Sequence, residues 1–141
     1  MKIVYWSGTG NTEKMAQLIG QGITESGKEV EVINVSNVDI SALLELLDEE
    51  ILVLGCPAMG DEVLEEGEFE PFIEEISTKV SGKKVALFGS YGWGDGKWMR
   101  EFEERMTGYG CTVIDEPLIV QNEPDEMAEE CINLGKKIAS I

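Results

Sequence analysis

The sequence contains no histidine, few basic residues and no long apolar segment, and each shortage excludes a class of function. Without histidine the chain lacks the usual general base and metal ligand, and it cannot form a Ser-His or Cys-His nucleophile pair. Lys plus Arg number 11 against 28 Asp plus Glu, which gives a net charge of −17. A surface this negative repels phosphate backbones and anionic lipid headgroups, so we expect neither nucleic-acid binding nor membrane-surface binding.

Cysteine is also scarce. The three cysteines, Cys56, Cys111 and Cys131, are too far apart in sequence to form a CxxC motif for zinc or thioredoxin-type chemistry. A sparse, odd set fits a reducing cytoplasm, where we expect the protein to act. Apolar runs such as Ile51–Leu54 are four residues long, far short of the ~20 that a transmembrane helix needs. The apolar stretch after Lys2 is too short for a signal peptide.

What is present indicates one packed domain. Hydrophobic residues make up 43% of the chain, which is enough to fill a single core and rules out a disordered chain. We therefore expect residues 1–141 to form a single domain. Recurrent short apolar runs, several of them near-continuous Val, Ile and Leu, indicate strands buried on both faces of a sheet. The predicted strands are Lys2–Trp6, Glu29–Asn34, Ile51–Gly55, Lys84–Gly89 and Thr112–Gln121.

The segments that follow these strands are long enough for helices and show a helical apolar period. Their apolar stripes are Met15, Leu18, Ile19 and Ile23; Ile40, Leu43, Leu44 and Leu47; Phe69, Phe72, Ile73 and Ile76; Trp98, Phe102, Met106 and Tyr109; and Met127, Cys131, Leu134, Ile138 and Ile141. This alternation predicts an α/β fold, a doubly wound five-stranded parallel sheet flanked by helices. Glu116-Pro117 interrupts the last predicted strand, which indicates a bulge or an edge position.

The first polar loop, residues 7–12, joins the first predicted strand to the first predicted helix and reads Ser-Gly-Thr-Gly-Asn-Thr. The free N–H groups and the dipole of a helix N-terminus attract an anion. The loop has neither the lysine of GxxxxGK[ST] nor the third glycine of GxGxxG, so it fits neither a nucleoside triphosphate nor a dinucleotide. It suits a terminal phosphate monoester held by neutral donors. A plain helix cap with a tight turn is the alternative.

Two further loops follow predicted strands and therefore lie at the same edge of the sheet, where such folds bind ligands. Residues 58–62 carry the soft, polarisable Met59, which suits an aromatic ring. Residues 90–96 surround Trp93 with alternating glycines. Together the three loops predict a slot for a flat, phosphorylated heteroaromatic molecule. Taken singly, the second could be an ordinary turn, and Trp93 could instead cap the core.

The segments SGTGNT at 7–12, PAMGDE at 57–62 and GSYGWGDG at 89–96 resemble those of the flavodoxin family, in particular the short-chain type from anaerobic bacteria. The resemblance runs over the whole chain. It implies the strand order 2-1-3-4-5, a non-covalent FMN and one-electron transfer between redox enzymes by a protein that is not itself an enzyme. It also implies a monomer that binds no metal.

The resemblance also implies a role for each loop residue. Residues 7–12 would hold the FMN phosphate, Met59 would pack on the inner face of the isoalloxazine ring and Trp93 on the outer face. Gly60 and Asp61 would face the N5 edge, and Glu62 would accept the N3–H of the ring. Pro57 has no hydroxyl and receives no role. The full set of expected FMN contacts is Ser7, Gly8, Thr9, Gly10, Asn11, Thr12, Ala58, Met59, Gly60, Asp61, Glu62, Ser90, Tyr91, Gly92, Trp93, Gly94 and Asn122.

Acidic residues are dense beside the second loop. Between residues 61 and 75 there is no base, and the acids are Asp61, Glu62, Glu65, Glu66, Glu68, Glu70, Glu74 and Glu75. A fixed negative charge ~10 Å from a ring that becomes anionic costs roughly 1–2 kcal/mol at an effective dielectric near 20. We therefore expect a low-potential carrier whose partners dock through basic patches. A solvated helix face is the simpler interpretation of these acids.

Two rival functions share the predicted fold. The first is an FMN-dependent quinone or small-molecule reductase, which would need a second substrate pocket that no extra loop of this short chain provides. The second is a phospho-acceptor signalling receiver, which needs aspartates at the ends of the first and third strands. Those ends read Tyr5-Trp6-Ser7 and Gly55-Cys56-Pro57, so this rival is set aside. Cys56 itself is expected to be a core residue.

Overall fold

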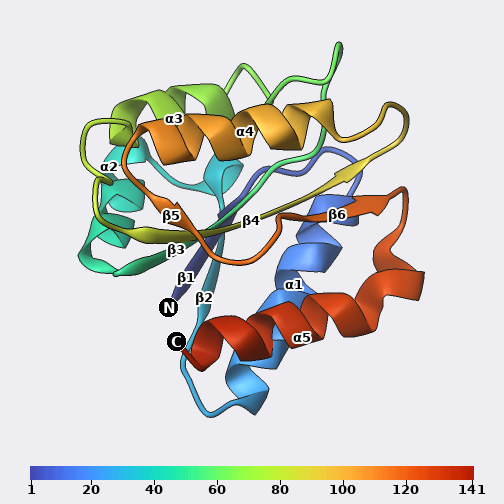
Figure 1. Cartoon of the computed structure of the whole chain (residues 1–141), viewed down its shortest axis with the longest axis horizontal. Helices are drawn as coiled ribbons and strands as arrows, with labels where there is room; N and C mark the ends of the chain where they lie inside the picture. The colour runs from blue at the N-terminus through green and yellow to red at the C-terminus, as the bar shows by residue number, and fades with distance from the viewer.

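The computed structural model describes residues 1–141 and contains one parallel sheet. Its strands lie in the order β2-β1-β3-β4-β5, with β6 also paired to β4, which confirms the predicted order 2-1-3-4-5 (Figure 1). The strands are β1 (Lys2–Tyr5), β2 (Glu31–Asn34), β3 (Ile51–Gly55), β4 (Lys84–Tyr91), β5 (Thr112–Val113) and β6 (Leu118–Gln121).

The predicted fifth strand is split into β5 and β6, and both parts pair in parallel with β4 at the sheet edge. Val113 pairs with Val85 and Leu118 pairs with Phe88. Between these two pairs, the segment from β5 to β6 therefore contains two more residues than β4. The extra residues bulge out next to Pro117, which cannot donate to a sheet ladder. The predictions of an interruption and an edge position are confirmed.

Helices cover both faces of the sheet (Figure 1). The helices α1 (Asn11–Glu25) and α5 (Ala128–Ala139) cover one face, and α2 (Ile40–Leu43), α3 (Phe69–Ile76) and α4 (Lys97–Gly108) cover the other. Buried side chains form two clusters accordingly: Ile3 and Tyr5 join the α1 and α5 side, and Val4 joins the α3 and α4 side. Because successive strand residues point to opposite faces, near-continuous apolar runs are what a doubly wound sheet requires.

The second predicted helix differs from its expected form. Only Ile40–Leu43 is α-helical, and a 3₁₀ helix, η2 (Leu44–Asp48), follows it. The tighter period of the 3₁₀ helix places Leu46 in the core in the same direction as Leu43, whereas Ile40 is 40% exposed. Lys83 Nζ donates to the carbonyl oxygens of Leu47 and Glu49 and so satisfies the end of η2.

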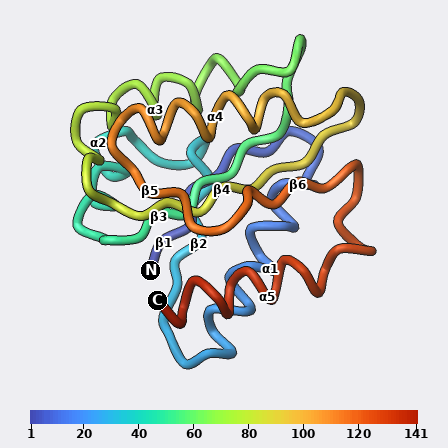
Figure 2. Tube along the Cα trace, viewed as in Figure 1, coloured from blue at the N-terminus to red at the C-terminus, as the bar shows by residue number.

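The helices α1 and α5 pack at very short range, which fixes the position of α1. A β-carbon on Gly22 would lie 2.0 Å from the Ile132 carbonyl oxygen, and one on Gly135 would lie 2.0 Å from that of Ile19. Only glycine permits this approach at both positions. The chain ends lie away from the polar loops: the Met1 ammonium pairs with Glu49, just before β3, and Ile141 lines a hollow together with Glu50 (Figure 2).

Candidate functional site

The three polar loops meet at the carboxyl ends of β1, β3 and β4, where a pocket of about 230 Å³ opens. Nine residues that were expected to contact FMN line this pocket: Gly8, Thr9, Asn11, Ala58, Met59, Ser90, Tyr91, Gly92 and Asn122. The other eight lie outside its lining: Ser7, Gly10, Thr12, Gly60, Asp61, Glu62, Trp93 and Gly94.

Trp6 and Pro57 also line the pocket, and the sequence reasoning gave neither of them a role. Trp6 directly follows β1, and Pro57 lies two residues after β3, so their place after parallel strands is the signal that could have found them.

The loop after β1 is built to leave backbone N–H groups free. Gly10 adopts a left-handed conformation with φ 95° at the start of α1. Ser7 Oγ accepts hydrogen bonds from the N–H groups of Gly10 (3.1 Å) and Glu13 (3.3 Å), which fixes the loop shape. The N–H groups of Gly8, Thr9, Asn11 and Thr12 donate to no acceptor in the protein. Several unpaired N–H groups at and before the positive end of a 15-residue helix are an arrangement that attracts an anion.

The side chain of Thr12 is placed differently from the expectation that it faces the ligand. Its hydroxyl is 2.7 Å from the Ser90 hydroxyl, and both residues are almost fully buried. Ser90 lines the pocket, whereas Thr12 lies behind it. The pair therefore joins the start of α1 to the end of β4.

The loop after β3 forms a tight turn. Met59 and Val63 exchange two backbone hydrogen bonds, each 2.9 Å long, and residues 60–62 form the tip. Gly60 has φ 48° and Glu62 has φ 58°. A β-carbon on Gly60 would meet no atom within 4 Å, so the backbone conformation rather than lack of space favours glycine here.

Glu62 connects this turn to the loop after β4. Its Oε1 accepts hydrogen bonds from the N–H groups of Asp95 (3.1 Å) and Lys97 (3.3 Å), at the N-terminus of α4. A carboxylate at this end of a helix is stabilising. Glu62 Oε2 has no partner in the protein and remains available to another donor.

Trp93 lies at the tip of the loop after β4 and is 63% exposed, with no aromatic ring of the protein against it. Behind it, Trp98 is buried, donates its indole N–H to the Cys56 carbonyl oxygen (3.0 Å) and packs against Tyr91. The prediction that Trp98 is a core residue is confirmed. Trp93 therefore has a surface free for a flat ligand.

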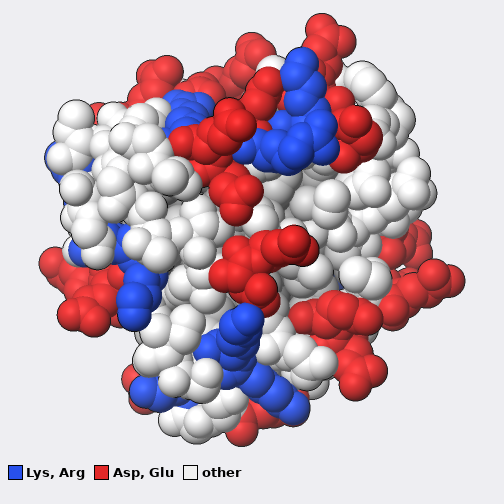
Figure 3. All heavy atoms as spheres, in the orientation of Figure 1, with Lys and Arg blue, Asp and Glu red and all other residues white.

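The acidic cluster makes several internal contacts. Glu65 caps α3 by accepting from the N–H groups of Gly67, Glu68 and Phe69. Glu68 Oε1 accepts from the Trp6 indole N–H (3.2 Å) and the Ser36 hydroxyl (2.8 Å). Two others form ion pairs, Glu70 with Arg105 and Glu75 with Lys79. Figure 3 shows acidic side chains spread over one face of the molecule, with basic side chains confined to small groups between them.

The cysteines are core residues. All three are free and buried, and burial raises the pKa of the Cys56 thiol to about 12 and that of Cys131 to about 11. A thiol held neutral in this way is a poor nucleophile and a poor metal ligand. No cluster of side chains suited to a metal ion is present.

This architecture and site define a class: an α/β protein that binds an anionic, flat ligand at the carboxyl edge of a parallel sheet. Comparison with known proteins identifies the family. Residues 3–135 match the family model described as flavodoxin. The flavodoxin of Clostridium beijerinckii is 77% identical over 141 residues, covering 100% of both chains. That of Megasphaera elsdenii is 42% identical over 139 residues, covering 99% of this chain and 98% of its own.

Solved structures agree with these matches. The solution structure of two-electron reduced Megasphaera elsdenii flavodoxin covers 99% of this chain and 98% of its own, with a TM-score of 0.87. A flavodoxin from the domain Archaea is 34% identical with a TM-score of 0.84, and the match covers 99% of this chain and 97% of that one. The chain belongs to the flavodoxin family, whose members bind FMN and carry electrons rather than act as enzymes. The reductase alternative is therefore not favoured. None of the helices has the length and apolar character to cross a membrane.

Proposed function

We propose that residues 1–141 form one domain that acts as a low-potential one-electron carrier, with FMN bound by the loops 7–12, 58–62 and 90–94 and by Asn122. The four unpaired N–H groups of the loop after β1 and the first turn of α1 are the observation that carries this proposal. They match a phosphate monoester, which is the charged end of FMN, and no lysine is needed to hold it.

The remaining residues fit the rest of the molecule. The pocket of about 230 Å³ is smaller than the ~300–1,000 Å³ usual for small-molecule sites, so it encloses only part of such a ligand. The flat ring then lies between the turn at Met59 and the exposed Trp93. Glu62 Oε2 is the free acceptor for a ring N–H, while Oε1 holds the start of α4 in place.

FMN supplies reversible one-electron transfer when it is bound, and the protein residues set how easily it is reduced. Carboxylates beside the turn disfavour added negative charge on the ring and so lower the potential. The same carboxylates attract basic surfaces on redox partner proteins and raise association rates. With its charge of −17 the protein repels copies of itself, and we propose a cytoplasmic monomer.

FMN binding to the purified, flavin-free protein tests the proposal. Titration with FMN should give saturable, equimolar binding, with quenching of flavin fluorescence and of the exposed Trp93. Riboflavin should bind more weakly because it lacks the phosphate. Equal affinity for FMN and riboflavin would contradict the assignment of the α1 loop as a phosphate site.

A further inference from the structure

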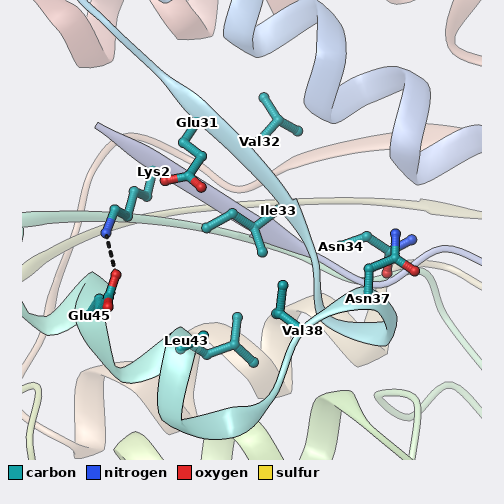
Figure 4. Close-up of a pocket in the computed structure, with 10 residues that line it drawn as sticks. Lys2, Glu31, Val32, Ile33, Asn34, Asn37, Val38, Leu43 and Glu45 are labelled. Carbon is teal, nitrogen blue, oxygen red and sulfur yellow. Dashed lines mark ion pairs between the residues drawn. The ribbon is translucent and has the colours of Figure 1, made fainter.

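A second hollow lies along the outer strand of the sheet, between β2 and the segment 38–45 (Figure 4). The aliphatic side chains of Ile33, Val38 and Leu43 point into it. The ion pair between Lys2 and Glu45 (3.9 Å) closes one end, and two asparagine amides lie at the other. We call this hollow the β2 groove. It shares no lining residue with the FMN pocket.

The backbone of β2 leaves hydrogen-bonding groups free along this groove. β2 is the outer strand and pairs only with β1. The Glu31 N–H donates to the Met1 carbonyl oxygen (2.9 Å). The parallel hydrogen-bonding pattern therefore directs the backbone N–H and C=O groups of Glu31 and Ile33 toward β1. The N–H and C=O of Val32, between them, then face outward. Unpaired groups of this kind are a template for an added strand.

Apolar exposure is concentrated at the same edge. The chain has six exposed large hydrophobic residues, and two of them, Val38 and Ile40, lie in or beside the β2 groove. A third, Val32, lies on β2 itself, with its side chain on the α1 face of the sheet. Each is between 37% and 40% exposed. Free backbone groups beside exposed aliphatic side chains are the features that strand addition uses for affinity and specificity.

We propose that the β2 groove binds an extended segment of a partner protein in which aliphatic and basic side chains alternate. The groove volume of about 240 Å³ is below the ~300–1,000 Å³ usual for small-molecule sites and suits the anchoring side chains of a peptide. Glu45 is paired with Lys2, whereas Glu31 pairs with no cation in the protein, so the unpaired charge in the lining is negative and favours basic residues in the segment. A second copy of the chain is disfavoured because each copy carries −17 and would bring its own Glu31 to the contact.

The groove lies beside the FMN site without overlapping it. Ser36 follows the end of β2, and its hydroxyl and the Trp6 indole N–H both donate to Glu68 Oε1. Trp6 lines the FMN pocket. A partner held by β2 would therefore lie next to the FMN pocket and leave the exposed Trp93 side open for electron transfer.

An NMR titration of the ¹⁵N-labelled, FMN-loaded protein tests this proposal, with the peptide acetyl-Lys-Val-Lys-Val-Lys-Val-Lys-amide as the probe. Saturable shifts should centre on residues 31–38, and a peptide with glutamate at each lysine should not bind. Val38→Lys should weaken binding about tenfold or more. The matched control is Ile141→Lys, which makes the same charge change at another exposed apolar residue (48%) and should change the affinity less than about twofold.

Val38→Ser removes the apolar wall without adding charge and should also weaken binding, and the FMN absorbance spectrum reports whether each variant keeps its fold. The proposal is overturned if Val38→Lys and Ile141→Lys weaken binding equally, because the attraction is then only general charge. Shifts centred on residues 58–62 and 90–96 would overturn it as well, and so would the absence of shifts at millimolar peptide. Dimerisation through β2 would show that a second copy occupies the groove.

Discussion

The buried hydroxyl pair of Thr12 and Ser90 permits a sharp test of how the proposed FMN site is supported. The two oxygens are 2.7 Å apart, with relative exposures of 1% and 3%. Thr12→Val removes one hydroxyl with little change in shape, and Ser90→Ala removes the other. Each single change leaves the remaining hydroxyl buried without its partner. The double change removes both.

The expected magnitudes follow from the cost of an unsatisfied buried hydroxyl. Each single variant should lose about 1–3 kcal/mol of unfolding free energy, because the remaining polar group stays desolvated. The double variant should lose no more than the worse single one, since replacing both partners by apolar groups can be nearly neutral. The interaction energy of the cycle should then be about 1–3 kcal/mol in magnitude.

Urea unfolding of the flavin-free protein, followed by circular dichroism, measures all four corners of the cycle. Thr78→Val provides the control, since Thr78 is exposed and its hydroxyl makes no hydrogen bond in the protein. Combined with Ser90→Ala, this control change should be additive. If the losses of Thr12→Val and Ser90→Ala simply add, the hydroxyls do not support each other and the reasoning is refuted.

Three further outcomes are expected. Thr9→Ala together with Asn11→Ala, both of which line the pocket, should lower FMN affinity about tenfold or more while riboflavin affinity barely changes, measured by fluorescence titration, and equal losses would contradict the phosphate site. Gly60→Ala should destabilise the flavin-free protein by about 1–2 kcal/mol because φ is 48°, and Gly60→Asn by less; no loss in urea unfolding would show that the turn relaxes freely. The stability that Cys56 contributes should be fully present below pH 9, the ordinary pKa of the thiol, and should fall as the pH rises toward its folded-state pKa of about 12. The reason is that only the thiol of the unfolded chain ionises in that range. Unfolding curves measured across this pH range check the sign.

The fold could be predicted because buried parallel strands have a distinctive pattern. Ile51–Gly55 is apolar throughout and is the whole of β3, and the position of the loops at strand ends follows from the doubly wound topology. The short α2 and its 3₁₀ continuation could not be predicted, because the spacing of Ile40, Leu43 and Leu44 fits an α-helix equally well. The contacts that stabilise the end of the 3₁₀ helix come from the distant Lys83, which no local pattern reports.

The composition of the site could be predicted more fully than its internal contacts. The nine pocket-lining residues lie in loops that the sequence marks by glycine, hydroxyl and aromatic residues. The bond from Thr12 to Ser90 spans 78 positions, and those from Glu62 to the start of α4 span 33 and 35. No local pattern reports such pairings, because they depend on how β4 and α4 are placed relative to the other loops.

The groups that contact each carboxylate of the acidic cluster determine how much of its negative charge is felt at a distance. Glu70 and Glu75 are paired with cations, Arg105 and Lys79, so much of their field is cancelled at a distance. Hydrogen bonds from neutral N–H and O–H groups fix the position of a carboxylate and leave its full negative charge. Such neutral donors hold Glu62, Glu65 and Glu68 in place. No hydrogen bond or ion pair within the protein involves the carboxylates of Asp61, Glu66 and Glu74. The negative potential beside the proposed FMN site therefore persists in the folded protein, and it comes partly from carboxylates whose positions are fixed.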